Sequence, residues 1–339
     1  MLLQSLPKIT LITPSFNQGA YLEQCIRSVI GQNYPHLEYI LIDGGSTDET
    51  RRVIRKYEKY LSYWVSEPDR GQSDAINKGL KRANGEIINW LNADDFYEKD
   101  TLWKVARTFM DTGAQVVGGR CRVFESPDRI SHLTNGTDLY PRNLAQTLGW
   151  ARTDQPATFF TCEAVQAMGC LDPDLHYLMD RDWWIKYLLH FGQERVVKIP
   201  DVLVNFRLHK DSKTVRHEDL FQLDRDTYYY ALARQTQLKS YARFLKKEAA
   251  LMPGYQIKNL PDIAPQLAEA TLNYYLLLRA DEHYAQSRYA EARRFLDFIH
   301  RSALDEVGRR HWYKLHYRHR YLPRPLIRIY RALRRQLHK

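Results

Sequence analysis

Short apolar runs alternate with amphipathic segments through the first hundred residues of the chain. The apolar runs have the length of buried strands, and the segments between them place apolar side chains at helical spacing. The predicted strands are 8–13, 38–43, 63–65 and 86–91, and the predicted helices are 19–31, 47–60 and 73–83. Because this alternation is typical of βαβ units, the pattern predicts an α/β fold with a Rossmann-like, mostly parallel sheet flanked by helices.

Polar clusters stand directly after three of the predicted strands. They are Pro14–Asn17, Asp43–Asp48 and Asn92–Asp95. In open parallel sheets, ligands bind beyond the carboxyl ends of the strands. We therefore expect these clusters to form the binding edge of the sheet.

The pattern is less regular after residue 113. Short strands are predicted at 115–117, 120–124 and 195–198, and a helix at 182–190. From about residue 220 the chain is predicted to be mostly helical, with a helical pair within 280–302. This pattern divides the chain into 1–218, with halves 8–112 and 113–218, and a helical extension 219–339.

Composition and charge narrow the class of protein. The 339 residues are 44% hydrophobic and can bury a sizeable core. The net charge of +10 arises in residues 301–339, which hold 12 Lys and Arg against 2 Asp and Glu, while the other residues hold 38 of each sign. The basic character therefore belongs to the C-terminal end, which disfavours a nucleic-acid-binding main domain.

The last residues, 322–339, combine an apolar stripe with arginines. The stripe is Leu326, Ile329, Tyr330, Leu333 and Leu337, and the arginines are Arg328, Arg331, Arg334 and Arg335. A basic amphipathic helix is typical of contact with an anionic membrane surface. Packing of the stripe on the protein itself and binding of RNA are the alternatives.

Cysteine usage and the chain ends indicate the compartment. Cys25, Cys121, Cys162 and Cys170 show neither CxxC pairing nor the density of a disulfide framework, so we interpret them as small hydrophobic residues of a reducing compartment. Residues 1–5 lack a basic signal-peptide region, and no apolar stretch approaches the ~18 residues of a membrane span. These features predict a cytoplasmic protein, with peripheral contact to the cytoplasmic face of the membrane through its tail.

Several nucleotide-binding classes are disfavoured by missing motifs. Residues 15–19 replace the G-x-G-x-x-G of a dinucleotide-dependent dehydrogenase, and no Walker A sequence of an ATPase is present. The glycine-rich loop of a sugar nucleotidyltransferase is also missing after the first strand. A different nucleotide chemistry is therefore expected.

The two acidic clusters allow two interpretations each. Asp43 can accept a hydrogen bond from a nucleobase or ribose, or it can belong to an ordinary turn in which Ser46 or Thr47 caps the next helix. Asp94 and Asp95 repel each other unless a cation neutralises them, and carboxylates suit Mg²⁺ or Mn²⁺. The alternative is a solvated turn before the next helix.

The order of the motifs along the chain is more specific than any single one. It runs through Thr13-Pro14-Ser15-Phe16-Asn17, Ser28-Val29-Ile30-Gly31-Gln32, Asp43-Gly44-Gly45-Ser46-Thr47-Asp48, Gly71-Gln72-Ser73-Asp74-Ala75-Ile76-Asn77-Lys78-Gly79, Asn84-Gly85-Glu86 and Asn92-Ala93-Asp94-Asp95. Over residues 8–215 this string resembles the family 2 inverting glycosyltransferases with the A-type fold. The resemblance implies a donor half at 8–112 and an acceptor half at 113–218.

The resemblance implies roles for individual residues on the donor side. Phe16 would stack on the donor base, Asp43 would bond the base or ribose, and Asp94 with Asp95 would hold a divalent metal on the diphosphate. His209 would complete the metal shell. The full set of implied donor-binding residues is Pro14, Ser15, Phe16, Asn17, Asp43, Asp74, Asn92, Ala93 and Arg207.

The catalytic base is expected in residues 179–182. Asp180 matches the base of the family, with Asp182 as the second candidate, although either residue could simply cap a helix. The chain departs from the family pattern at Asn92, where Asp is usual, at Ile76, where Arg is usual, and at Met179, where Glu is usual. These departures leave the sugar nucleotide open.

Together these observations predict a metal-dependent hexosyltransferase that inverts the sugar. Its cofactor would be Mg²⁺ or Mn²⁺, and its donor a nucleotide-diphosphate sugar, with UDP-sugars favoured over GDP- or dTDP-sugars. The acceptor would be a glycan or lipid-linked precursor in polysaccharide or glycolipid synthesis. The alternative is a non-catalytic nucleotide-sugar or carbohydrate-binding scaffold with the same fold.

Overall fold

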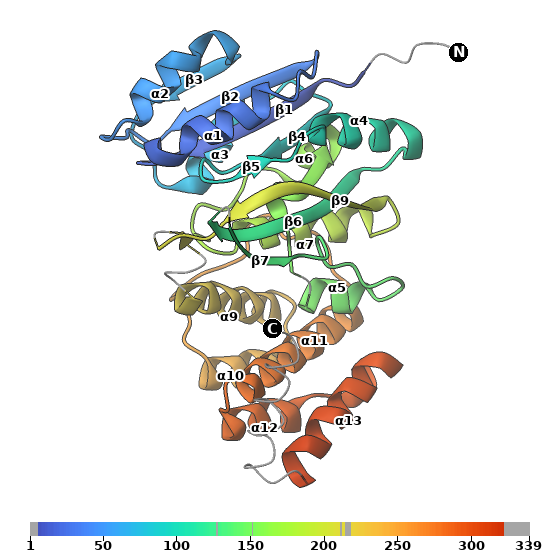
Figure 1. Cartoon of the computed structure of the whole chain (residues 1–339). Helices are drawn as coiled ribbons and strands as arrows, with labels where there is room; N and C mark the ends of the chain where they lie inside the picture. Colours follow the sequence, from blue (N-terminus) through green and yellow to red (C-terminus); the bar gives the residue numbers. More distant parts are fainter. Residues whose placement is uncertain (1–5, 127, 151, 211, 214–217, 322–339) are drawn as a thin grey trace.

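The computed structural model describes the chain except for residues 1–5, 127, 151, 211, 214–217 and 322–339 (Figure 1). The strands are β1 (Ile9–Ser15), β2 (Leu37–Asp43), β3 (Tyr63–Ser66), β4 (Ile87–Trp90), β5 (Phe96–Tyr97), β6 (Val116–Ser126), β7 (Arg129–Leu133), β8 (Thr158–Thr161) and β9 (Val196–Arg207). Among the described residues they form a nine-stranded sheet of order β3-β2-β1-β4-β8-β6-β9-β5, with β7 paired to β6. The predicted α/β class is confirmed.

Parallel pairing is confined to particular parts of this sheet. β3, β2, β1 and β4 are all parallel to one another, and β6 is parallel to β9. The pairs β4 with β8, β6 with β8 and β5 with β9 are antiparallel. The strand order reverses at β1, which is flanked by β2 and β4, and such a switch point opens a crevice at the strand ends.

Helices cover both faces of the sheet. The helices of the first two thirds of the chain are α1 (Gly19–Ile30), α2 (Thr50–Tyr57), α3 (Gln72–Leu80), α4 (Thr101–Thr112), α5 (Leu144–Trp150), α6 (Cys162–Met168) and α7 (Met179–Phe191), with short 3₁₀ turns η1 (Glu58–Tyr60) and η2 (Gln155–Ala157). Leu11 and Leu41 pack in the core of α1, α2 and α4, whereas their neighbours Ile12 and Ile40 pack in the core of α3 and α7. This alternation follows from the two-residue period of strands.

The strands β6 and β9 are longer than the sequence indicates. The sequence predicts a break at the glycine pair 118–119 and a strand end at residue 198, yet β6 continues through the glycines and β9 continues past Pro200. Gly118 pairs with Lys198 and Arg120 with Val202, so β9 carries two extra residues there. Proline is tolerated at such a bulge because no ladder hydrogen bond is required of it.

The C-terminal helices extend the core on one side of the sheet rather than forming a separate cluster. They are α9 (Glu218–Gln235), α10 (Lys239–Glu248), α11 (Pro265–Ala285), α12 (Tyr289–Phe298), the turn η3 (Arg301–Ala303) and α13 (Glu306–Tyr321). They gather at the end of the molecule opposite α2 and β3 (Figure 1). One hydrophobic cluster runs from Ile12 of β1 to Leu315 of α13.

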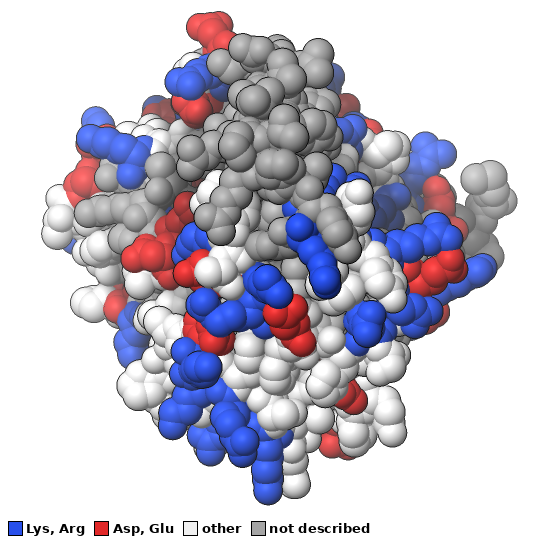
Figure 2. Space-filling view, turned by 90° about the horizontal axis from the view of Figure 1, so that it is seen from below, with Lys and Arg blue, Asp and Glu red and all other residues white. Residues whose placement is uncertain are grey.

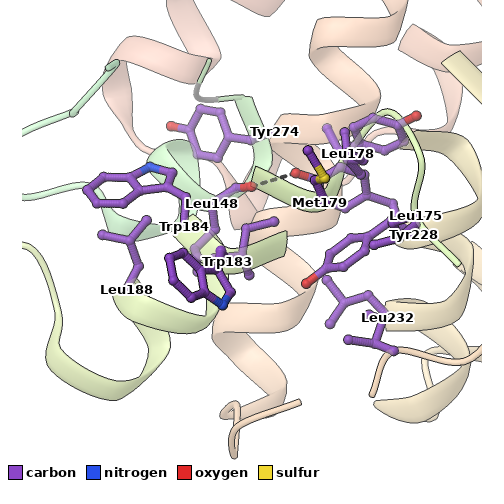
Figure 3. Close-up of a cluster of buried hydrophobic side chains, with 14 of the residues drawn as sticks. Leu148, Leu175, Leu178, Met179, Trp183, Trp184, Leu188, Tyr228, Leu232 and Tyr274 are labelled. Atoms are coloured by element: carbon purple, nitrogen blue, oxygen red, sulfur yellow. Dashed lines mark hydrogen bonds between the residues drawn. The ribbon is translucent and has the colours of Figure 1, made fainter. Parts of the chain in front are cut away.

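Helix α7 is embedded in this cluster. Its side chains Trp183, Trp184 and Leu188 are buried among residues of α5, α9 and α11, including Tyr228 and Tyr274 (Figure 3). Buried aromatic side chains contribute large contact areas. In the first turn of α7, the Arg181 guanidinium also lies 5.6 Å from the ring centre of Tyr229 in α9, so the helical extension contacts this turn.

Other expectations concern the cysteines and the chain ends. All four cysteines are free thiols; Cys25 and Cys121 are buried as expected, whereas Cys170 is exposed. No helix within the described residues has the length and apolar character needed to cross a bilayer. Residues 1–5 and the amphipathic segment 322–339 lie outside the described residues.

A buried histidine of α11 predicts the pH dependence of stability. His283 is 5% exposed, and neither ring nitrogen has a hydrogen-bond partner among the described residues. Burial and the nearby arginines lower its pKa to about 4. The unfolded state therefore binds a proton more readily, and stability present above pH 6.5 is lost as the pH falls toward 4. This loss should be about 2 to 3 kcal/mol between pH 7.5 and 4.5, and we expect it to disappear in His283→Leu when urea unfolding is measured at the two pH values.

Candidate active site

The loops that follow β1 and β2 are hydrogen-bonded to each other at the carboxyl edge of the sheet. The backbone N–H of Asn17 donates to Ser46 Oγ (2.7 Å), and the backbone N–H of Thr47 donates to Asn17 Oδ1 (2.9 Å). The backbone N–H of Gly19 donates to Asp48 Oδ2 (2.9 Å). Asn17 has a φ of 52°, a left-handed conformation that asparagine tolerates. These bonds join the two loops into one rim.

The residues predicted to line the nucleobase of the donor differ in their exposure. Pro14 and Ser15 are buried at the end of β1, whereas Phe16 is 60% exposed beside them. An exposed aromatic ring at this position has a face free for stacking on a planar ligand. Pro14 and Ser15 form the buried end of β1, from which the loop with Phe16 begins.

Asp43 is fully buried at the end of β2, where serine groups surround it. Its carboxylate accepts hydrogen bonds from the backbone N–H of Ser46 (3.0 Å) and from Ser66 Oγ (2.6 Å), and also from the hydroxyl of Ser46. In this arrangement Asp43 orders the turn. Because Asp43 is closed off from solvent, a direct bond to a base or ribose requires the surrounding groups to move.

The remaining predicted donor residues near β4 and α3 are dispersed. Asn92 Oδ1 accepts a hydrogen bond from Gln72 Nε2 (2.7 Å) at the strand end, and Ala93 is 2% exposed, so that only its backbone can meet a ligand. Asp74 instead accepts from the backbone N–H of Arg70 (3.2 Å) and borders a pocket of about 220 Å³ between α3, residues 170–173 and Lys258. Among the described residues, no hydrogen bond joins Asp74 to the other predicted donor residues.

Asp94 and His209 meet although 115 residues separate them in the sequence. Asp94 Oδ2 lies 3.0 Å from His209 Nε2, and the two side chains are 17% and 10% exposed. The His209 ring packs against Tyr21 of α1, with ring centroids 4.7 Å apart. The chain after β9 thus brings a histidine to the turn after β4.

Arg207, at the end of β9, is held against the same turn. Its Nε donates to the backbone carbonyl of Asp94 (3.1 Å), and its Nη2 donates to Gln24 Oε1 (2.6 Å). The guanidinium also lies 4.7 Å from the ring centre of Phe124 and 5.1 Å from that of Tyr21. A cation is therefore fixed next to Asp94.

Asp95 points into the protein rather than toward His209. It is 1% exposed, its Oδ1 accepts a hydrogen bond from the backbone N–H of Arg207 (2.9 Å), and its Oδ2 has no partner among the described residues. Burial and the neighbouring Asp94 raise the pKa of Asp95 well above its ordinary value. The structure therefore differs from the expectation of a ligand pair: Asp95 anchors the end of β9, and Asp94 alone faces His209.

Asp94 and His209 fit the protein side of a divalent-cation site that a ligand must complete. Within the described residues, no three His, Cys, Asp or Glu side chains are arranged to hold a metal. A carboxylate oxygen and an imidazole nitrogen are both metal ligands, and Mg²⁺ and Mn²⁺ commonly take further oxygens from phosphates. The diphosphate of a donor supplies such oxygens.

Asp180 lies in the first turn of α7 and is partly exposed. Its Oδ1 accepts a hydrogen bond from the backbone N–H of Arg181 (2.8 Å). Burial raises its pKa to about 6, while that N–H and the charges of Arg181 and Lys213 lower it. A carboxylate with a raised pKa is a stronger general base than an ordinary one and is still ionised at pH 7.

Asp182 is fully buried on the other side of the helix. Its Oδ2 forms an ion pair with Lys186 Nζ (2.7 Å), whose side chain is 2% exposed. An acceptor hydroxyl cannot reach a carboxylate enclosed in this way. The expectation that Asp182 is an alternative base is therefore not supported by its position.

Gln72 and Lys213 join the two sides of the site and were not singled out as functional from the sequence. Lys213 Nζ donates to Gln72 Oε1 (2.8 Å) and to the backbone carbonyl of His176 (3.1 Å). Gln72 in turn donates to Asn92, as described above. The sequence offers only weak signals for these two residues. Gln72 is a polar residue at the start of α3, and Lys213 directly follows the segment Arg207–Ser212.

The charge of Lys213 predicts a change in pH dependence. Because its ammonium lowers the pKa of Asp180, Lys213→Met is expected to raise that pKa. A general base must be deprotonated, so the acid limb of kcat/KM for transfer should move to higher pH, with a severalfold loss at pH 6 and a smaller loss at pH 8.5. Lys213→Arg should restore the profile. An equal loss at both pH values in Lys213→Met would contradict the electrostatic role.

Comparison with known proteins identifies the family. Residues 10–165 match the model for glycosyl transferase family 2. The uncharacterized glycosyltransferase Rv1514c of Mycobacterium tuberculosis (strain H37Rv) is 30% identical over 192 residues, which are 55% of this chain and 70% of that protein. The chain belongs to glycosyltransferase family 2.

Two further proteins are similar to this chain, one in sequence and one in structure. TuaG of Bacillus subtilis (strain 168), whose name refers to teichuronic acid biosynthesis, is 38% identical over 108 residues, which are 31% of this chain and 43% of TuaG. The crystal structure of S. aureus TarS residues 1–349 has a TM-score of 0.57 and 17% identity, and covers 91% of this chain and 86% of that one. This family 2 chain therefore shares the fold of TarS, as expected for the A-type fold.

Proposed function

We propose that this chain is an inverting glycosyltransferase that moves a sugar from a nucleotide-diphosphate sugar to an acceptor hydroxyl. The contact of Asp94 with His209, 3.0 Å apart beside the carboxyl edge of the sheet, carries the proposal. It gathers a carboxylate, an imidazole and the Arg207 guanidinium where the diphosphate of a donor would lie.

The donor is proposed to be a UDP-sugar. TarS residues 1–349, which share the fold of this chain, have been crystallised with UDP-GlcNAc, and that likeness has a TM-score of 0.56. The exposed ring of Phe16 and the rim formed by Asn17 and Ser46 offer a place for the base. GDP- and dTDP-sugars are the alternatives that a binding assay separates.

In the proposed reaction, Asp180 removes the proton of the acceptor hydroxyl, whose oxygen attacks the anomeric carbon on the face opposite the diphosphate. The bond from the anomeric carbon to the diphosphate breaks, and the configuration inverts. Arg207 holds a positive charge beside the leaving diphosphate. A bound Mg²⁺ or Mn²⁺, with Asp94 and His209 as protein ligands, would supply Lewis-acid stabilisation of the leaving group.

The acceptor is proposed to be a glycan or lipid-linked precursor of a cell-surface polymer. The name of TuaG supports this class, although only 43% of the length of TuaG is matched. The proposed location is the cytoplasm, with peripheral contact to the membrane, as expected from the composition of the chain.

Thermal stabilisation by UDP-, GDP- and dTDP-sugars, each with Mn²⁺ and with EDTA, tests the donor site. Ligand binding stabilises the folded protein by mass action and so raises its unfolding temperature. At a ligand concentration of about 100 times Kd, the free energy of unfolding rises by about 2.7 kcal/mol. A shift that requires Mn²⁺ and occurs with one nucleotide supports the proposal. Absence of a shift with every donor favours a scaffold without nucleotide-sugar binding, and NMR of the product's anomeric proton tests inversion.

A further inference from the structure

Helix α13 carries aromatic side chains on the face that points away from the protein. Tyr313 is 54% exposed, Tyr317 59% and Val307 62%, which makes them three of the eight large hydrophobic residues exposed in the described part of the chain. Arg310 and Lys314 are exposed beside them. At 100° per residue these five positions fall on one side of the helix, which we name the outer stripe: Val307, Arg310, Tyr313, Lys314 and Tyr317.

The inner face of α13 is fully engaged with the protein. Trp312 and Leu315 are buried, and Trp312 Nε1 donates a hydrogen bond to the carbonyl of Leu296 (2.9 Å). Gly308 lies so close to α11 that an added Cβ would be 2.6 Å from Tyr274 Oη. The helix therefore cannot turn its outer stripe inward.

The surroundings of the outer stripe are strongly basic. Residues 306–321 hold five Lys and Arg against one acidic residue, Glu306, which pairs with Arg310. Seen from the end formed by the C-terminal helices, groups of Lys and Arg side chains lie on the surface, with Asp and Glu side chains between some of them (Figure 2). The chain then continues into residues 322–339, which hold six Lys and Arg and no acidic residue.

These charges discriminate between possible occupants of the stripe. The equally basic segment 322–339 and a second copy of α13 are both repelled by α13. An anionic surface is attracted, at about 1 kcal/mol for each Lys or Arg near a negatively charged leaflet. Tyrosine has an apolar ring and a polar hydroxyl and is enriched where hydrocarbon meets water. We infer that the outer stripe of α13 docks the protein on an anionic lipid bilayer.

The inference places the helix in the plane of the bilayer surface. The rings of Tyr313 and Tyr317 enter the headgroup region while Arg310 and Lys314 contact lipid phosphates. The surface is independent of the donor site, because α13 lies at the opposite end of the molecule from α2 and β3 (Figure 1). It therefore stands even if the proposed reaction is wrong.

Vesicle sedimentation of the full chain tests the inference. Vesicles of phosphatidylcholine with about 30% phosphatidylglycerol carry a negative surface charge and are expected to bind the protein. Vesicles of pure phosphatidylcholine are not expected to bind it. The double variant Tyr313→Ser/Tyr317→Ser should weaken binding about tenfold, and Arg310→Gln/Lys314→Gln about thirtyfold, corresponding to about 1 kcal/mol per basic residue. The exposed residues of the control variant Tyr60→Ser/Ile130→Ser lie elsewhere, and this variant should bind as the parent does.

Three outcomes would overturn the inference. They are equal binding by the tyrosine variant and the parent at unchanged unfolding temperature, equal binding to neutral and anionic vesicles, and tighter binding of the stripe to RNA than to anionic vesicles. Transfer to a water-soluble acceptor, measured on the same variants, separates this surface from the catalytic proposal. Such transfer is expected to be unchanged.

Discussion

Asp180→Asn is expected to lower kcat for sugar transfer by about 10² to 10⁴-fold, the range that a general base contributes. The amide keeps an oxygen that can accept the hydrogen bond of the Arg181 backbone N–H, so the first turn of α7 stays in place. Donor binding, measured by calorimetry with the nucleotide sugar and Mn²⁺, should be unchanged. Turnover at the parent rate would show that another group removes the proton.

The matched comparison is Asp182→Asn, because the two aspartates share one helix but differ in surroundings. Loss of the Asp182 charge leaves Lys186 buried without its ion-pair partner, and breaking a buried pair in this way costs about 3–5 kcal/mol of stability. We expect a marked fall in unfolding temperature, and residual activity that follows the folded fraction. If Asp182→Asn folds normally and loses turnover selectively, the assignment of the base must be reversed.

Asp94→Ala is expected to abolish the part of donor affinity that depends on Mn²⁺. A metal site that loses its carboxylate keeps only His209 as a protein ligand. Loss of a group that merely orients a ligand already costs about 10- to 100-fold, so we expect donor Kd to rise at least about a hundredfold. The measurement is calorimetric titration of the donor with Mn²⁺ and with EDTA. In the variant, the two titrations should give the same weak affinity.

Asp95→Asn is the matched comparison that tests which of the two adjacent carboxylates binds the metal. An asparagine oxygen can still accept the hydrogen bond of the Arg207 backbone N–H, so β9 should keep its end in place. The effect on donor Kd should be much smaller than that of Asp94→Ala. Equal losses in the two variants would mean that both carboxylates bind the metal.

This difference between Asp94 and Asp95 marks where sequence reasoning reaches its limit. The two residues are chemically identical and adjacent, so pattern alone places both at the end of β4. Their directions depend on β9, which supplies the Arg207 backbone N–H to Asp95, and on the chain directly after it, which brings His209 to Asp94. Contacts over more than a hundred residues cannot be read from local spacing.

The first half of the fold follows closely from the pattern because its strands are short, apolar and bounded by turns. The second half does not, and Gly119 shows why. An added Cβ there would lie 2.4 Å from the side chain of Leu203, so the glycine serves close packing of β6 against β9. In a sequence, a glycine pair looks like the end of a strand.

Gln72 and Lys213 illustrate a different difficulty. Neither side chain has chemistry that singles it out, and their bridge exists only because the start of α3 lies near the chain after β9. Asp180, by contrast, was found because residues 179–182 resemble the acidic pair that the family places at the start of a helix. Residues with distinctive chemistry are easier to find than those whose importance depends on position.

The burial of α7 among the C-terminal helices bears on how such a chain could be recombined. Trp183 and Trp184 lie in one buried cluster with side chains of α9 and α11, and Arg181 lies 5.6 Å from the ring centre of Tyr229 in α9. Both helices are encoded well after the motif that contains Asp180. A hybrid gene joined near residue 218 would combine α7, which carries the proposed catalytic base, from one parent with the tyrosines of α9 and α11 from another. Exchange of acceptor preference between relatives therefore requires α7 and the terminal helices to be inherited as one block.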